Sequence, residues 1–200
     1  MLNRILNPAY HLLKRVSEHL TVERVREDKM LKESGRGRQS DGREDDAIEV
    51  GLQHARAAEE GYRALKNVRE LARVWESIGR LLMKAGQSQQ ALEVLERALQ
   101  AQQQLGDMIG LARTTGAVAE LLCAAGDLRR GLLLMRESLA LNQEKLSAQG
   151  LYYNRQSFDA ILKQLSPQQR QVNQLALGTL AAELGRAEAR MERIRPSSRG

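Results

Sequence analysis

The side chains of this sequence that could bind a charged partner are basic residues that recur at helical spacing. Arg73 and Arg80 fall on one face of a helix expected over 68–85, and Arg113 stands forty residues after Arg73. Guanidinium and ammonium groups donate charge-assisted hydrogen bonds to carboxylates, so this face is expected to bind an acidic peptide or helix. The alternative is that these groups pair with nearby acids such as Glu76. The candidate binding residues are Arg73, Arg80, Lys84, Arg113, Glu120, Tyr153 and Lys163.

The residue types that serve catalysis and metal binding are few and scattered. The three histidines, His11, His19 and His54, have no cysteine or acid at a recurring metal-ligand spacing. Cys123 is the single cysteine and has no histidine at motif spacing, so we interpret it as a small packed side chain. The sequence has no glycine-rich phosphate loop and no nucleophile motif. These observations predict a non-catalytic protein without metal or cofactor.

Two tandem stretches of forty residues, 71–110 and 111–150, must position these side chains. The second stretch repeats the first at the same offsets, with Leu81-Leu82 matching Leu121-Leu122 and Leu99 matching Leu139. Self-similarity at this period is typical of stacked helical hairpins, each of which buries its apolar face against its neighbours. The sequence therefore predicts an all-α solenoid of antiparallel helical hairpins with extra helices at both ends.

Helix start and stop signals divide the chain further. A stretch with three glycines and no apolar residue follows the first expected helix, 8–32, and is typical of a flexible linker. We expect a helical segment over 1–33, a linker over 34–43, the repeat domain over 44–194 and a loose tail over 195–200. Glycine breaks are expected at residues 86, 106, 126 and 150. The first helix of the repeat domain is expected to begin near Glu44 and to include 51–67, which aligns with 91–107. The helices expected after it are 68–85, 89–105, 108–125, 128–148, 151–165 and 167–194.

Small residues recur where the two helices of a hairpin should meet. Gly79 faces Ala91 in the first stretch, and Ala119 faces Gly131 in the second. A small side chain lets two helix backbones approach closely, so these positions predict the lines of contact within each hairpin.

A set of residues at fixed spacing recurs from one unit to the next. In the first unit it is Trp75, Ile78, Gly79, Leu82, Ala91, Leu95 and Ala98, and the matching positions recur in 111–150 and, more degenerately, in 151–190. This pattern resembles the signature of the tetratricopeptide repeat. The resemblance implies an adaptor whose concave groove binds a partner's peptide or helix. The family's best-known clamp grips a terminal carboxylate with Lys and Asn pairs. The residues at that spacing here are Glu76 with Arg80 and Gly116 with Glu120, which differ from the pattern.

Charge and composition narrow the choice of partner. The chain has 31 basic and 25 acidic residues and a net charge of +6, which favours an acidic protein or peptide. Aromatic residues make up only 3%, and no dense basic cluster occurs, so a nucleic-acid partner is not expected.

The sequence contains no stretch of 18 apolar residues, so no transmembrane helix is expected. The lone cysteine favours a cytoplasmic protein, although the basic amphipathic stretch 1–17 leaves organelle targeting open.

The last expected helix has an apolar seam at alternating spacings of three and four residues. The seam is Leu177, Leu180, Leu184, Ala187, Met191 and Ile194. Such a seam is typical of a coiled coil, which would make a homodimer, but it also suits a helix that caps the final hairpin. A related alternative to the adaptor is a structural subunit of a larger assembly that uses its convex face and terminal helices.

Overall fold

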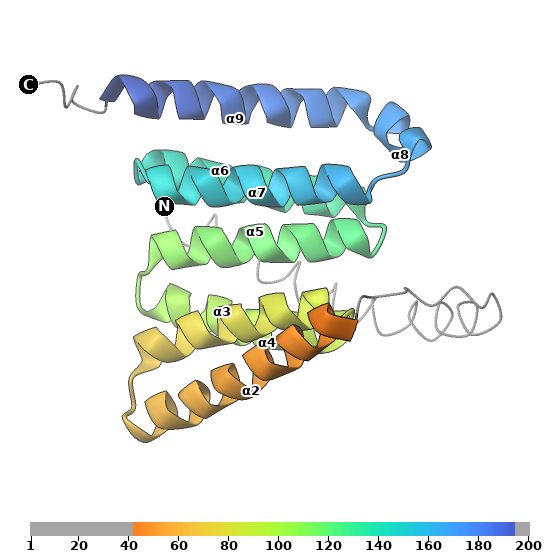
Figure 1. Cartoon of the computed structure of the whole chain (residues 1–200). Helices are drawn as coiled ribbons and strands as arrows, with labels where there is room; N and C mark the ends of the chain where they lie inside the picture. Colours follow the sequence, from red (N-terminus) through yellow and green to blue (C-terminus); the bar gives the residue numbers. More distant parts are fainter. Residues whose placement is uncertain (1–41, 195–200) are drawn as a thin grey trace, which may run out of the picture. The chain divides into compact units, whose positions relative to one another are not determined.

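The computed structural model describes residues 42–194, and every regular element in that range is an α-helix (Figure 1). The predicted all-α fold of the helical-repeat, α-solenoid class is therefore confirmed. The expected helix 8–32, the linker up to residue 41 and the tail 195–200 lie outside the described residues. The helices are α2 (Gly42–Ala64), α3 (Val68–Lys84), α4 (Ser88–Gln104), α5 (Met108–Ala124), α6 (Leu128–Glu144), α7 (Ala148–Gln164), α8 (Pro167–Val172) and α9 (Gln174–Ile194).

The chain divides into two compact units within α4, the first ending at Ala101 and the second beginning at Gln102. In the first unit α2 packs against α3, and the indole nitrogen of Trp75 donates a hydrogen bond of 2.9 Å to the Glu59 carboxylate on α2. In the second unit α5, α6 and α7 pack against one another, and α9 lies over α6 and α7 (Figure 1).

A repeat of twenty residues underlies the forty-residue repeat of the sequence. Each helix from α3 to α7 is 17 residues long, and three-residue turns separate them. The middle residue of each turn has a positive φ, which is +73° at Gly86, +64° at Gly106 and +90° at Gly126. Glycine adopts this conformation without steric cost, so it ends each helix at a fixed place.

The turn after α6 departs from the sequence prediction. Leu146, not Gly150, has the left-handed conformation, with φ of +48°, and Ser147 then caps α7 through a bond from the Gly150 amide. The predicted break at Gly150 is therefore wrong, because the twenty-residue spacing places the turn four residues earlier. Gly150 instead lies in the first turn of α7, where a Cβ would collide with the Asn142 side chain.

Glycines mark the lines of close contact within the hairpins, as predicted. A Cβ at Gly79 on α3 would lie 2.6 Å from the Leu95 side chain on α4. A Cβ at Gly131 on α6 would lie 2.8 Å from the Ala119 carbonyl oxygen on α5 and would collide with the Cys123 sulfur. Large side chains fill the space beside these lines, and those on the second unit's helices are fully buried, for example Leu122 and Met135.

A buried polar network joins the three helices of the second unit. The Ser138 hydroxyl on α6 donates a bond of 2.6 Å to the Ala112 carbonyl oxygen on α5. The Asn154 amide on α7 donates a bond of 2.7 Å to Ser138 and accepts one of 2.7 Å from Asn142. Because buried polar groups need partners, this network favours one register of α5, α6 and α7 over shifted ones.

Helix α9 caps the hairpin of α6 and α7. The seam residues Leu177, Leu180, Leu184 and Ala187 are all buried within the second unit. Two bidentate ion pairs flank them, one from Arg136 to Glu183 and one from Arg155 to Glu188. The first four seam positions are thus occupied by the chain itself, whereas Ile194 is 49% exposed, and a homodimer through the buried positions would require α9 to leave α6 and α7. The predicted helix 167–194 is also interrupted, by a turn at Asn173 between α8 and α9.

No helix within residues 42–194 combines the length and the apolar character needed to cross a membrane.

Candidate functional site

Three of the predicted binding residues lie on α3, in the first unit. Arg73 is exposed and forms an ion pair of 2.9 Å with Glu70, while Lys84 is exposed near the end of the helix. Arg80 is half-buried and lies 3.4 Å from the Glu76 carboxylate, which is only 4% exposed. The alternative expected from the sequence, pairing with a nearby acid, is therefore confirmed for Arg80. The exposed ion pair of Arg73 with Glu70 contributes about 0–1 kcal/mol, so a partner's carboxylate can compete for Arg73.

The other four predicted residues lie in the second unit, where two of them meet. The Arg113 guanidinium on α5 lies over the Tyr153 ring on α7, 5.8 Å from the ring centroid. The Tyr152 ring contacts Tyr153 edge-on with centroids 5.8 Å apart. Glu120 is half-buried and Lys163 is exposed. The structure thus brings Arg113 and Tyr153 together, one from each of two consecutive first helices, and holds the guanidinium by a cation–π contact.

Gly116 and Glu120, the second pair of residues at the spacing of the family's carboxylate clamp, are not both accessible to a ligand. Gly116 is buried, and a Cβ there would lie 3.3 Å from the Ser138 hydroxyl. Cys123 is also buried, and burial, with smaller contributions from Asp127 and Glu120, raises the pKa of its thiol to about 12. The interpretation of Cys123 as a packed thiol is confirmed.

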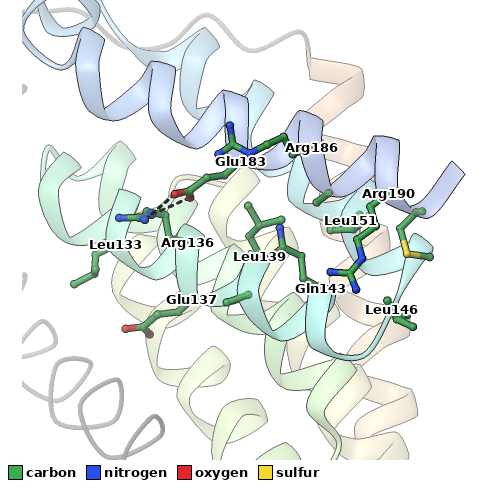
Figure 2. Close-up of a pocket in the computed structure, with 13 residues that line it drawn as sticks. Leu133, Arg136, Glu137, Leu139, Gln143, Leu146, Leu151, Glu183, Arg186 and Arg190 are labelled. Carbon is green, nitrogen blue, oxygen red and sulfur yellow. Dashed lines mark hydrogen bonds and ion pairs between the residues drawn. The ribbon is translucent and has the colours of Figure 1, made fainter. Parts of the chain in front are cut away.

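A pocket that the sequence did not reveal lies between α6 and α9 in the second unit (Figure 2). Its volume is about 530 Å³, which is within the usual range for ligand pockets. Leu139, Leu151 and Ala187 are buried and form its apolar floor. The remaining lining residues are Leu133, Arg136, Glu137, Ala140, Gln143, Leu146, Glu183, Arg186, Arg190 and Met191.

Some of the charged side chains that line this pocket form ion pairs and others do not. Arg136 donates bonds of 2.9 and 2.7 Å to Glu183, and these bonds raise the pKa of the Arg136 guanidinium (Figure 2). Arg186 and Arg190 have no ion-pair partner among residues 42–194. Burial raises the pKa of the Glu137 carboxyl, which points away from Arg186 and Arg190 (Figure 2). The pocket therefore offers two arginines to a ligand beside an apolar floor.

The sequence contained one signal for this pocket. Arg186 and Arg190 stand four residues apart, so they share a face of α9, but nothing in the sequence said which helix faced them. Within the described range, no three residues of the types His, Cys, Asp and Glu lie close enough to hold a metal ion.

Comparison of the chain with protein-family models, curated proteins and solved structures finds no match in any of the three.

Proposed function

We propose that this chain is a non-catalytic interaction scaffold of the tetratricopeptide-repeat kind, which binds a peptide or helix of a partner protein on the basic face of its first helices. The observation that carries the proposal is the placement of Arg113 over the Tyr153 ring on consecutive first helices. A guanidinium held by an aromatic ring is oriented before a ligand arrives, so less conformational entropy is lost on binding.

Charge and helix geometry support an acidic partner for this face. Arg113 and Lys163 contribute positive charge from α5 and α7, and Arg73, Arg80 and Lys84 contribute it from α3. A peptide with several carboxylates matches the donors of α5 and α7 within the second unit, and the donors of α3 form a separate basic surface of the first unit. We place this scaffold in the cytoplasm, where a single reduced cysteine such as Cys123 is ordinary.

The test compares charge reversal at the proposed face with charge reversal elsewhere on the same unit. Fluorescent peptides rich in Glu and Leu are titrated with the full chain, and the same peptides with Gln in place of Glu serve as the ligand control. Arg113→Glu should weaken binding of the acidic peptides about tenfold, whereas Arg129→Glu, at an exposed position on α6, should not. Circular dichroism verifies that both variants remain helical. Equal affinities for Arg113→Glu and the unchanged chain would exclude this face as the site.

Exposed apolar side chains favour a second candidate, a structural subunit of a larger assembly. Val172 at the end of α8 is 79% exposed and Leu175 at the start of α9 is 85% exposed. Both line a shallow pocket with Gly178, Thr179 and Ala182. Apolar groups presented together in this way are typical of surfaces that another protein covers. Light scattering of the full chain and of the Val172→Asp, Leu175→Asp double variant tests this candidate. If the chain assembles with itself through this surface, the measured molar mass of the assembly should be lower for the variant.

A further inference from the structure

The pocket between α6 and α9 combines an anchor point for an apolar side chain with two arginines that have no ion-pair partner among residues 42–194. Its floor is formed by Leu139 on α6, Leu151 on α7 and Ala187 on α9, all less than 5% exposed. Because these three side chains are almost inaccessible to water, the apolar surface that a ligand can cover lies at the rim of the pocket, where Leu146 is 48% exposed. Leu146 alone would accept many apolar groups and gives no preference among them.

The arginines on α9 supply that preference. Arg190 extends from α9 into the opening, with its guanidinium toward Gln143 on α6 (Figure 2). Arg186 lies one turn earlier on the same helix and also lines the pocket. Because Glu183 is bound in two places by Arg136, it does not neutralise this pair. The open charge of the pocket is therefore positive, and it is next to the apolar floor.

The rim residue Leu146 provides a second observation. It has φ of +48° at the turn position where Gly86, Gly106 and Gly126 stand in earlier turns. A leucine in this conformation costs about 1–2 kcal/mol relative to its preferred conformations. Its side chain is nevertheless 48% exposed and lines the pocket, so its burial in the core does not offset the strain. The spacing of the turns fixes this conformation, as it does at Lys66 with φ of +54°, and it leaves the Leu146 side chain at the rim of the pocket.

We propose that the pocket between α6 and α9 is a second peptide-binding site, which takes a segment of a partner protein with an apolar side chain next to acidic residues. The apolar side chain packs against Leu146 at the rim of the pocket, above the buried side chains of Leu139, Leu151 and Ala187. The neighbouring carboxylates bind Arg186 and Arg190.

A peptide fits this pocket better than an isolated fatty acid or anionic metabolite. Gln143 lines the pocket and has no side-chain hydrogen bond to any other residue of the described range. Its amide can both donate to and accept from a peptide backbone, which offers the same two groups. The site is independent of the face with Arg113 and Tyr153, so failure of one proposal leaves the other standing.

The experiment uses the full chain and three synthetic fluorescent peptides. The first peptide carries one Leu flanked by Glu residues, the second replaces that Leu by Ala, and the third replaces each Glu by Gln. Binding is measured by fluorescence anisotropy at about 0.1 M salt, and amide chemical shifts of the isotope-labelled chain locate the ligand. We expect the first peptide to bind at least about tenfold more tightly than the other two, with shifts concentrated in α6 and α9.

Matched variants separate binding from folding. Arg190→Glu should weaken the first peptide about tenfold, while Arg193→Glu, on the same helix but outside the pocket, should leave its affinity unchanged. Leu146→Gly should weaken binding severalfold although it relieves backbone strain and does not lower the melting temperature. Lys66→Gly makes the same backbone change at φ of +54° in the first unit and should not affect binding.

Several results would overturn the proposal. One is equal affinity for all three peptides or for the Arg190→Glu variant. Another is a pattern of chemical shifts confined to α5 and α7, which would assign the peptide to the other face. A third is binding of phosphatidylglycerol vesicles, but not peptide, that Arg190→Glu abolishes, because the pocket would then take a lipid surface. A fourth is a dimer that Arg190→Glu converts to a monomer without peptide binding, because a second copy would then fill the pocket.

Discussion

A methyl group added at Gly131 tests the close approach of α5 and α6, on which the fold of the second unit depends. The new Cβ would lie 2.8 Å from the Ala119 carbonyl oxygen and 3.1 Å from the Cys123 amide nitrogen, both backbone atoms, and would collide with the Cys123 sulfur. Backbone atoms of a packed helix cannot turn aside as a flexible side chain can. The Gly131→Ala variant must therefore push α6 away from α5.

The size of the effect follows from two opposing contributions. Overpacking a core by a methyl group costs about 1–3 kcal/mol. Replacing glycine by alanine inside a helix contributes about 0.5–1 kcal/mol of stability. Gly178 on α9 supplies the matched control, because a Cβ there meets no atom within 4 Å. The helix contribution is common to both variants, so the difference between Gly131→Ala and Gly178→Ala measures the packing cost, about 1–3 kcal/mol.

The assay is urea and thermal unfolding followed by circular dichroism, with the unchanged chain measured beside both variants. Gly178→Ala should be slightly more stable than the unchanged chain, and Gly131→Ala less stable. A stability difference of 1 kcal/mol corresponds to about 2–4 °C for a chain of this length. If Gly131→Ala were as stable as Gly178→Ala, α5 and α6 would not meet at this glycine, and the packing inferred from the repeat would be refuted.

Three further predictions concern the turns, the thiol and the polar network. Lys66→Gly should raise stability by about 0.5–1 kcal/mol, measured by thermal unfolding, because glycine adopts the positive φ of this turn without strain. Cys123 should react slowly with a thiol reagent in the folded chain, and stability should fall as pH rises from about 9 to about 12. The unfolded chain releases the thiol proton first over that range, and a Cys123→Ala variant should lack this dependence. Asn154→Ala should cost about 1–3 kcal/mol in urea unfolding, because it leaves the buried Asn142 amide without its acceptor and removes the bond that Ser138 accepts.

The helices could be predicted from the sequence because their signals are local. Gly86, Gly106 and Gly126 are the residues that a left-handed turn prefers, and each stands at the end of a helix as expected. Ser166 and Gln169 form a capping box at the start of α8. Signals of this kind depend on a few neighbouring residues, so they are legible without knowledge of the tertiary structure.

The turn at Leu146 shows where local signals are insufficient. Leucine disfavours a positive φ, while Gly150 stands a few residues later as an apparent break. The spacing of twenty residues between turns was the better guide, because it reflects the packing of helices of equal length. Tertiary packing fixes that spacing, and here it overrides the preference of a single residue.

The two candidate sites differ in the same way, because one could be predicted from the sequence and the other could not. Arg113 and Tyr153 could be paired from the sequence because they stand one repeat apart, and equivalent positions of neighbouring repeats share a face. The pocket between α6 and α9 could not be found in this way, because α9 does not belong to the repeat. Its lining depends on which side of the final hairpin α9 covers, and an apolar seam alone does not specify that.

The pocket lies where the packing of helices differs from that within the hairpins. Within the hairpins, glycines such as Gly131 let backbones nearly touch, and no room remains between them. The glycines of α9, Gly178 and Gly185, face open space rather than a neighbouring helix. Long side chains, Arg136 with Glu183, span the distance from α6 to α9 instead. The pocket lies beside this ion pair, above the buried leucines Leu139 and Leu151, and Arg186 and Arg190 of α9 also line it.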